Sequence, residues 1–275
     1  MKKKLVIVIV IAIIFGCNSK QTVHSEKRYV VTSPEVAEII CLFEGAENIV
    51  GITSECDYPV YLQQKQIIGN FGKIDFEKIL NLNPSLVFTA GLEQDALAEE
   101  LKKLDISTEK IHSHSISEML DSIVRIGNLI EKETRAEFVV DSLKTEIASI
   151  PKLKKNPKVY IEIYGDPIMS VSDSSFVGQL INLAGGKNIF PTLPRDYSRI
   201  NPEKVIEANP EIIILTYPGM TAENIKNRKG WQVLDAVKSN RIYDINQIDP
   251  NLILRASPRM INGVKEIQKV FNEEK

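Results

Sequence analysis

The sequence predicts an α/β protein of two related lobes, with central, mostly parallel sheets and a ligand cleft between the lobes. The main observation is an internal repeat, in which IDFEKILNLNPSLVF at 74–88 matches INPEKVIEANPEIII at 200–214. Each copy predicts a short helix that ends at Asn-Pro, followed by an apolar strand. A second pair, PEVAEIICLFEGAENIV at 34–50 and SSFVGQLINLAGGKNIF at 174–190, predicts an amphipathic helix in each lobe. Ligands commonly bind in the cleft between two such lobes.

Strands and helices alternate along the chain, which predicts parallel βα units of Rossmann-like type. Apolar runs predict strands at 29–32, 49–53, 86–90 and 107–111 in the first lobe, and at 158–164, 169–171, 212–216 and 241–245 in the second. Helix starts are also marked by the sequence. Ser33 and Pro34 supply an N-cap and a proline at the first helical position, and Ser115 with Glu118 predicts a capping box.

One long, rigid helix is predicted to join the lobes. Residues 132–150 contain no glycine or proline, and apolar residues recur at helical spacing until Pro151 ends the pattern. A helix of about 19 residues is roughly 28 Å long, enough to run from one lobe to the other. We therefore divide the chain into a first lobe at 29–131, this helix at 132–150 and a second lobe at 151–275. A stiff connection predicts only modest closure on a ligand.

The N-terminus predicts export. Lysines at 2–4 precede an apolar run at 5–15. This run is too short to span a membrane, which needs about 20 apolar residues, and it fits the core of a secretory signal. It ends in Ile-Phe-Gly-Cys, which resembles a bacterial lipobox, so we expect Cys17 to be acylated. An ordinary cleaved signal with a chance cysteine is the alternative.

Residues 1–17 are therefore assigned to a lipoprotein signal peptide, and the polar residues 18–28 to a flexible tether. We expect the protein in the periplasm or on the outer face of the cell membrane, held by its lipid anchor.

Composition is that of a globular protein, with 43% hydrophobic residues, 25% charged residues and a formal net charge of −2. No basic stripe is present, which argues against nucleic-acid binding. Cys41 and Cys56 remain after lipidation. They could pair in an oxidising compartment, but Cys41 lies on the apolar face of a predicted helix, which also fits a buried thiol. We expect a monomer.

Five local motifs, in this order, resemble the helical-backbone substrate-binding proteins of ABC importers, the group that handles cobalamin, ferric siderophores and haem. They are GITSECDYP at 51–59, IIGNFGKIDFEKILNLNPSLVF at 67–88, SFVGQLINLAGGKNIF at 175–190, INPEKVIEANPEIIIL at 200–215 and RASPRMINGVKEI at 255–267. The CDYP and RASPR segments are most similar to the vitamin B12-binding members. The resemblance implies a receptor, not an enzyme, that captures a corrinoid and delivers it to a permease dimer with its ATPase. The alternative is a receptor for a ferric siderophore or haem.

The repeat places an aromatic residue at the same point of each lobe, Phe71 and Tyr197, six residues before a matched glutamate. Facing aromatic rings suit a large, flat and mostly apolar ligand. In cobalamin-binding relatives, aromatic residues at these positions pack against the ligand, as does the tyrosine that matches Tyr58. Any one of these rings could instead belong to the core.

Three further positions are carried over from the resemblance. Met169 stands where the pattern has another aromatic residue, Arg255 matches an arginine that reaches polar ligand groups, and Asn251 stands where the pattern has an acid. The resemblance implies no intrinsic cofactor, and a bound ligand that is cobalamin or another corrinoid, alternatively a ferric siderophore or haem. Siderophore pockets commonly add basic residues, which Arg195, Arg199 and Arg255 could supply.

Glu77 and Glu203 begin the two matched helices and are expected to be exposed. A carboxylate near a helix N-terminus is favoured by the helix dipole, which alone could explain either residue. In the family that the chain resembles, an acidic residue on each lobe docks with arginines of the permease dimer. The resemblance therefore implies a docking role for both glutamates.

His112 and His114 form the one possible metal motif, but a zinc site needs three or four ligands. Histidines of a surface loop fit the pattern better, and contact of His114 with a ligand stays open. An exported hydrolase is an alternative from another class, yet the sequence contains no Gly-x-Ser-x-Gly and no His-Glu-x-x-His motif. A stand-alone adhesion or sensing module is a further alternative, which would lack permease and ATPase genes beside it.

Overall fold

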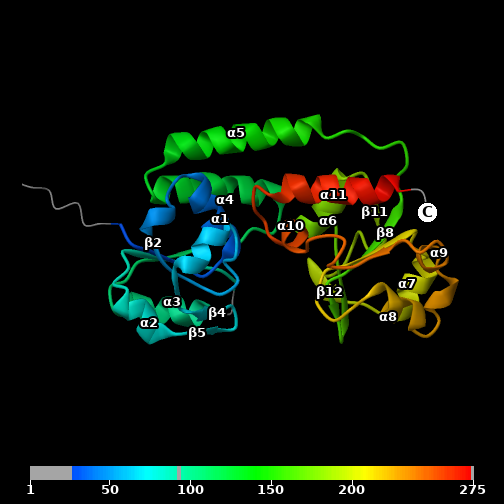
Figure 1. Cartoon of the computed structure of the whole chain (residues 1–275), viewed down its shortest axis with the longest axis horizontal. Coiled ribbons are helices and arrows are strands. Elements are labelled where there is room, and N and C mark those ends of the chain that lie inside the picture. The colour runs from blue at the N-terminus through cyan, green and yellow to red at the C-terminus, as the bar shows by residue number, and fades with distance from the viewer. Residues whose placement is uncertain (1–26, 92–93, 274–275) are drawn as a thin grey trace, which may run out of the picture.

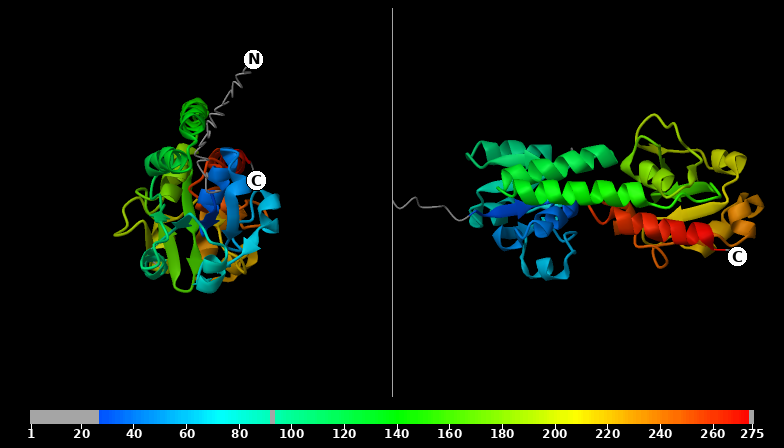
Figure 2. Two further views of the ribbon diagram at one scale, coloured as in Figure 1. Left: turned by 90° about the vertical axis from the view of Figure 1, so that its left-hand side faces the viewer. Right: turned by 90° about the horizontal axis from the view of Figure 1, so that it is seen from above.

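The computed structural model describes residues 27–91 and 94–273. Two α/β lobes lie side by side along the long axis, and helices run along one edge of both lobes (Figure 1). The view from above shows α5 (Glu133–Ser149, green) and α11 (Met260–Asn272, red) on this edge (Figure 2). The predicted signal peptide, Cys17 and most of the tether lie outside the described residues. In the part of the chain that the structure describes, no helix combines the length and the apolar character needed to cross a membrane.

The first lobe contains a five-stranded sheet in the order β3-β2-β1-β6-β7, in which all neighbouring strands are parallel. The central strand is a continuous apolar run, Tyr-Val-Val, and is buried. Such a run suits a strand that is covered on both faces. The strands are β1 (Tyr29–Val31), β2 (Ile49–Ile52), β3 (Gln66–Ile67), β6 (Leu86–Thr89) and β7 (Thr108–Lys110), with a short hairpin of β4 (Gly69–Asn70) and β5 (Lys73–Ile74). The helices are α1 (Pro34–Leu42), α2 (Phe76–Asn81), α3 (Asp95–Lys102) and α4 (Ile116–Leu129), with 3-10 turns η1 (Ala46–Asn48) and η2 (Val60–Gln64).

The second lobe contains a four-stranded parallel sheet, β11-β8-β13-β14, and a smaller antiparallel sheet, β12-β10-β9. The strands are β8 (Lys158–Glu162), β9 (Tyr164–Gly165), β10 (Ile168–Val171), β11 (Lys187–Asn188), β12 (Tyr197–Arg199), β13 (Ile212–Leu215) and β14 (Ile242–Tyr243). The helices are α6 (Phe176–Leu183), α7 (Pro202–Ala208), α8 (Ala222–Asn227), α9 (Asp235–Lys238), α10 (Asn251–Leu254) and α11, with the 3-10 turn η3 (Trp231–Val233).

The two large sheets repeat each other, which confirms the predicted fold class. The order β2-β1-β6-β7 in the first lobe matches β11-β8-β13-β14 in the second. Each lobe also has an insertion of its own, which explains why the spacing between matched residues varies along the chain. The second lobe adds the hairpin of β9 and β10, and the first adds the segment that contains η2 and β3. All eight predicted strands are present, although the one expected at 158–164 is broken at Ile163.

Helix α5 packs along α4 and continues over the junction between the lobes (Figure 1). Arg135 Nε donates to the carbonyl of Leu42 in α1 over 3.1 Å, and Gln268 Nε2 in α11 donates to the carbonyl of Pro151 over 2.8 Å. A single cluster of buried side chains continues from β1 and α1 through α4 and α5 to β8, α6 and α11. Packing therefore joins the lobes beneath α5. The division of the chain at 132 and 150 remains our proposal.

The marked helix starts are capped as the sequence suggests. Ser33 Oγ accepts from the N–H of Val36 at 3.4 Å, and Ser115 Oγ accepts from the N–H of Glu118 at 3.1 Å. In a capping box, the Glu118 side chain would accept from the N–H of Ser115. Here Glu118 Oε2 accepts instead from the N–H of His114, one residue earlier, at 2.8 Å. This bond holds the backbone of the histidine loop against α4.

Cys41 and Cys56 are free thiols in this structure. Cys56 is buried, with its Sγ 3.5 Å from Thr53 Oγ1, and burial raises the pKa of its thiol to about 11. Burial also raises the pKa of the Cys41 thiol. Of the two alternatives that the sequence leaves open, the structure agrees with thiols.

Candidate ligand-binding site

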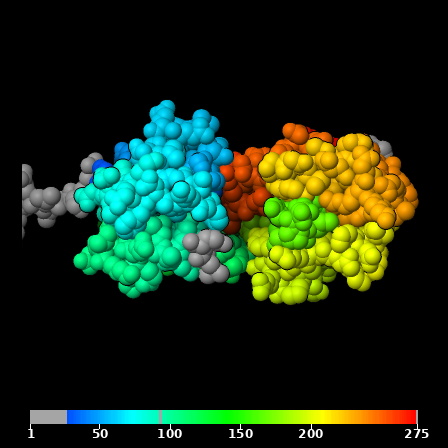
Figure 3. Space-filling view, turned by 90° about the horizontal axis from the view of Figure 1, so that it is seen from below, coloured from blue at the N-terminus to red at the C-terminus, as the bar shows by residue number. Residues whose placement is uncertain are grey.

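A groove separates the two lobes on the side away from α5. Figure 3 shows this side, with the β9–β10 hairpin (green) on the surface of the second lobe and the segment around α10 (red-orange) between the lobes. In open parallel sheets, ligands bind beyond the carboxyl ends of the strands. The β9–β10 hairpin directly follows the carboxyl end of β8, so this is the side on which a ligand is expected.

The small antiparallel sheet forms a side-chain face that includes two of the predicted ligand contacts. Met169 lies opposite Tyr164 on one neighbouring strand and opposite Arg199 on the other, and Val171 lies opposite Tyr197. Residues directly opposite each other in an antiparallel pair, and residues two apart on one strand, point to the same side. Met169 and Tyr197 therefore share one face of the sheet.

This face is directed toward the first lobe. Val171 belongs to the buried cluster that spans both lobes, and Tyr197 packs against that cluster. Ile168, which points to the opposite side, packs against a separate cluster within the second lobe. We call the side of the sheet that carries Tyr164, Met169, Tyr197 and Arg199 the cleft face.

Tyr197 is the more enclosed of the two tyrosines on the cleft face. Burial raises the pKa of its hydroxyl to about 12, and the negative charges of Asp196 and then Glu35 add to this. Glu35 lies in the first turn of α1, so its influence comes from the other lobe. Burial also raises the pKa of Glu35 itself. The ring of Tyr197 thus lies where the two lobes approach each other.

Phe71 lies in the turn between β4 and β5 on the first lobe, with 43% of its side chain exposed. Its backbone N–H donates to Glu55 Oε2 at 3.0 Å. The ring borders a small hollow of about 200 Å³, together with Phe76 and Leu97. An exposed aromatic ring on a turn held by hydrogen bonds is available for contact with a ligand.

Arg255 lies between the lobes, and its guanidinium is hydrogen-bonded to groups of the first lobe. Nη1 donates to Asp57 Oδ1 at 2.6 Å and to Glu38 Oε1 at 3.1 Å, and Nη2 donates to the carbonyl of Glu55 at 3.0 Å. Only 10% of the side chain is exposed. Asn251 begins α10, and its N–H donates to Asp249 Oδ1 at 2.9 Å. In this geometry Arg255 ties the second lobe to the first.

Sequence reasoning missed the partner of that arginine. Glu38 in α1 is 3% exposed, and both of its carboxylate oxygens accept bonds from the second lobe. Oε2 accepts from Ser257 Oγ at 2.7 Å and from Arg259 Nε at 3.0 Å, while Oε1 accepts from Arg259 Nη2 at 2.8 Å as well as from Arg255. A glutamate on the apolar side of a predicted helix was the available signal. We call Glu38, Arg255, Ser257 and Arg259 the junction cluster.

Tyr58 lies on another side of the junction from the cleft face. The guanidinium of Arg259 stacks on its ring at 3.9 Å, a cation–π contact. The tyrosine borders a cavity of about 310 Å³ together with Cys41 and Leu42 from α1 and Glu146 from α5. Neither Met169 nor Tyr197 lines this cavity.

Glu77 and Glu203 occupy equivalent places in the first turns of α2 and α7, and both are exposed. Their helices lie on the side of each lobe away from α5 (Figure 1). Neither carboxylate forms an ion pair with any residue in the described ranges. The two acids are therefore available to a partner that contacts both lobes.

The histidine loop also reaches the second lobe. His114 Nδ1 lies 3.0 Å from Asp196 Oδ2, and Asp196 Oδ1 accepts from Ser174 Oγ at 2.7 Å. The His112 ring meets the His114 ring edge-on, with centroids 4.5 Å apart. Within residues 27–91 and 94–273, no group of three histidine, cysteine or acidic side chains is arranged to hold a metal ion. His114 instead contributes a contact between the lobes.

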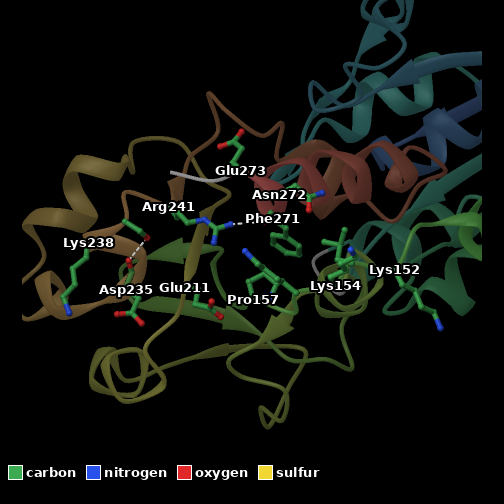
Figure 4. Close-up of a pocket in the computed structure, with 13 residues that line it drawn as sticks. Lys152, Lys154, Pro157, Glu211, Asp235, Lys238, Arg241, Phe271, Asn272 and Glu273 are labelled. Carbon is green, nitrogen blue, oxygen red and sulfur yellow. Dashed lines mark hydrogen bonds between the residues drawn. The ribbon is translucent and has the colours of Figure 1, made fainter.

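A cavity of about 940 Å³ lies at the outer end of the second lobe (Figure 4). Its lining includes Pro157, Glu211 and Arg241, each of which directly precedes a strand of the main sheet. The cavity is therefore at the amino ends of the strands, opposite to the edge where ligands bind in such sheets. Size alone does not make it the ligand site.

Comparisons with known proteins agree with this fold. A family model described as periplasmic binding protein matches residues 30–248. The chain is 28% identical over 262 residues to the uncharacterized ABC transporter substrate-binding lipoprotein YvrC of Bacillus subtilis, covering 91% of this chain and 82% of that protein. It is 27% identical over 259 residues to the high-affinity heme uptake system protein IsdE of Staphylococcus aureus, covering 88% of each.

Among solved structures, a possible iron-binding (periplasmic solute-binding) protein from Staphylococcus epidermidis is similar to this one. It superimposes with a TM-score of 0.78 at 26% identity, over 90% of this chain and 98% of that chain. The similarity extends over both lobes and the helix between them.

Proposed function

Because the chain belongs to the periplasmic binding protein family, we propose that it captures a large planar macrocycle between its lobes and passes it to an ABC importer. Members of this family are substrate-binding transport proteins, not enzymes. A corrinoid such as cobalamin is the ligand that we put first. The proposal concerns the ligand and the residues that hold it.

The observation that carries the proposal is the cleft face. Tyr197 and Met169 share one side of a small sheet directed toward the first lobe, and that lobe contributes the exposed ring of Phe71. Flat apolar surfaces from two lobes suit a flat ligand, because rings bury a large area at a small cost in conformational entropy. A corrinoid also carries the axial ligands of its own cobalt, so it needs contact area from the protein more than it needs a metal ligand.

Haem is the second candidate, and one specific observation favours it. Arg199 lies on the same face, opposite Met169, and is exposed, with no ion pair to any residue in the described ranges. An arginine at that point suits a carboxylate at the rim of a ligand. The relative IsdE is named as a heme uptake system protein, which supports the same choice.

We propose that delivery uses Glu77 and Glu203, one from each lobe, as docking points for basic residues of the permease dimer. Two exposed acids on equivalent helices support this, since a two-fold partner can contact both at once. We further propose that Cys17 carries a lipid that keeps the protein at the membrane surface, outside the cytoplasm. The relative YvrC is itself described as a lipoprotein.

Titration of the soluble protein from residue 18 onward tests the ligand. Cyanocobalamin, haemin and a ferric hydroxamate siderophore are each titrated by calorimetry and, for the coloured ligands, by absorbance. One-to-one submicromolar binding of cyanocobalamin supports the corrinoid, and preferential binding of haemin supports the second candidate. Preference for the siderophore, or failure of all three, contradicts the proposal of a planar macrocycle.

A further inference from the structure

We propose that Tyr164 extends the cleft face into a rigid aromatic wall that contacts the bound macrocycle, and that Tyr217, Glu162 and Arg228 are the positioning residues that hold this wall. The inference rests on the proposed function, since it names further contacts of the same ligand. It concerns four residues that sequence reasoning left without a role.

Glu162 is a fully buried carboxylate at the carboxyl end of β8. Each of its oxygens accepts two bonds. Oε2 accepts from Tyr160 Oη at 2.8 Å and Arg228 Nη1 at 2.6 Å, and Oε1 accepts from Tyr217 Oη at 2.5 Å and Arg228 Nη2 at 2.9 Å. The pair with Arg228 is bidentate, the most directional form of this interaction. The carboxylate is therefore a fixed point to which Tyr217 is attached.

Arg228 is itself held from the other side. Its guanidinium stacks on the ring of Trp231 at 4.2 Å, and its Nη2 lies 3.9 Å from the sulfur of Met220. Trp231 is fully buried in the core of the second lobe. Because the arginine is clamped between a buried ring and a buried carboxylate, the hydroxyl of Tyr217 has little freedom to move.

Tyr217 and Tyr164 form the outer part of this assembly. Their ring centroids are 6.1 Å apart, tilted by 46°. Close approach requires the glycine at 165, since a Cβ there would lie 2.3 Å from Tyr217 Oη. Tyr164 remains 52% exposed. A large ring that is half exposed, next to a ring fixed by a buried ion pair, is arranged for contact with something outside the core.

The strand register connects Tyr164 to the predicted contacts. Tyr164 lies directly opposite Met169, so its side chain is on the cleft face with Met169 and Tyr197. Tyr217 follows the end of β13 by two residues, at the carboxyl edge of the main sheet. The cleft face therefore continues from Tyr197 through Met169 to Tyr164, whereas Tyr217 supports the hairpin from the opposite side, the side of Gly165 and Ile168.

A purely structural role explains the buried charges less well. In the first lobe the residue that corresponds to Glu162 in the sheet register is Thr32, which donates to Gln94 Oε1 and to the carbonyl of Phe88. In the first lobe, the corresponding position is therefore filled by a neutral hydrogen-bonded pair, Thr32 and Gln94. Burying a carboxylate and a guanidinium brings a desolvation penalty that apolar packing avoids, so the charged pair in the second lobe is better explained by positioning of the tyrosine.

Four variants test the inference, each titrated with cyanocobalamin and with haemin. In Tyr164→Ala the ring is lost, and we expect binding of the preferred ligand to weaken by about tenfold, the effect of an aromatic contact of roughly 1.4 kcal/mol. Tyr164→Phe retains the ring and is expected to restore binding. Tyr217→Phe keeps the ring but releases it from Glu162, and is expected to weaken binding; because loss of a hydrogen bond to a charged group costs about 1.5–3 kcal/mol of stability, binding is measured well below its melting temperature. Phe138→Ala, which removes an exposed ring on α5, is the matched control and should bind like the wild type.

The outcomes separate the two proposals. If the wild type binds a macrocycle and Tyr164→Ala binds it equally well, the wall is overturned and the proposed function stands. If Tyr164→Ala and Phe138→Ala weaken binding alike, the effect is not one of the cleft face, and the wall is again overturned. If the wild type binds neither ligand, both proposals fail together.

Discussion

Replacement of Glu38 by glutamine is predicted to loosen the junction between the lobes. Glu38 is the acceptor at the centre of the junction cluster, where two arginines and a serine of the second lobe converge on one carboxylate of the first. Glutamine has the same shape but only one acceptor oxygen, and its amide would face a guanidinium. The change therefore leaves the arginine charges poorly compensated in a place that water reaches only in part.

The size of the effect follows from the burial of the group. Removing one partner of a buried ion pair costs about 3–5 kcal/mol of unfolding free energy. Glu38 is 3% exposed, but Arg255 keeps its second contact with Asp57, so we take the lower end, about 3 kcal/mol. For a protein of this size, that corresponds to a fall in the melting temperature of roughly 6–12 °C.

Urea unfolding followed by circular dichroism measures this change on the soluble protein. Glu47→Gln is the matched control, because Glu47 is exposed in the 3-10 turn that follows the same helix. The control is expected to stay within about 0.5 kcal/mol of the wild type. If Glu38→Gln also stays within that range, the junction cluster does not stabilise the contact between lobes and the reasoning is refuted.

Three other predictions can be checked independently. Reversal of charge in Glu77→Arg with Glu203→Arg should abolish uptake in cells while leaving ligand affinity unchanged, and normal uptake would contradict the docking role. Burial raises the pKa of Tyr197 to about 12, against about 10 in the unfolded chain. As the pH rises, the unfolded chain therefore loses this proton before the folded protein does, and the free energy of unfolding decreases between about pH 10 and pH 12. In Tyr197→Phe, the free energy of unfolding measured with urea should differ less between pH 9 and pH 11 than in the wild type. An equal difference would show that the hydroxyl of Tyr197 is not enclosed. Cys56, whose pKa is raised to about 11 by burial, should resist iodoacetamide at pH 8 in the native protein and react after unfolding, as judged by mass spectrometry, and rapid native labelling would show that it is accessible.

The fold could be predicted from the sequence because its signals are local. The central parallel strands β1, β6, β8 and β13 are short apolar runs that follow an Asn-Pro stop or precede a capped helix, and the repeat at 74–88 and 200–214 gives the same unit twice. The short strands β11 and β12 carry no such run, since they contain only Lys-Asn and Tyr-Ser-Arg. Their pairing depends on neighbouring strands and becomes visible only in three dimensions.

The candidate site was predictable only in part, because its organisation depends on contacts between distant residues. Glu38 and Arg259 are 221 positions apart, and no local pattern shows that they meet. The role of Tyr164 depends on a cross-strand register with Met169. Contact of Arg255 with the ligand stays a prediction, and its bonds to Glu38 and Asp57 are visible only in the structure.

The most direct test of the central claim is a calorimetric titration of Phe71→Ala, Tyr197→Ala and the double variant with the macrocycle that the wild type prefers. Loss of one buried ring is expected to cost about 1.5–3 kcal/mol, or roughly 10- to 100-fold in affinity, for each single variant. The account predicts that both single variants lose affinity by this amount and that the double variant loses more than either. Wild-type affinity in both single variants would show that the ligand does not bind between these two rings, and would contradict the account.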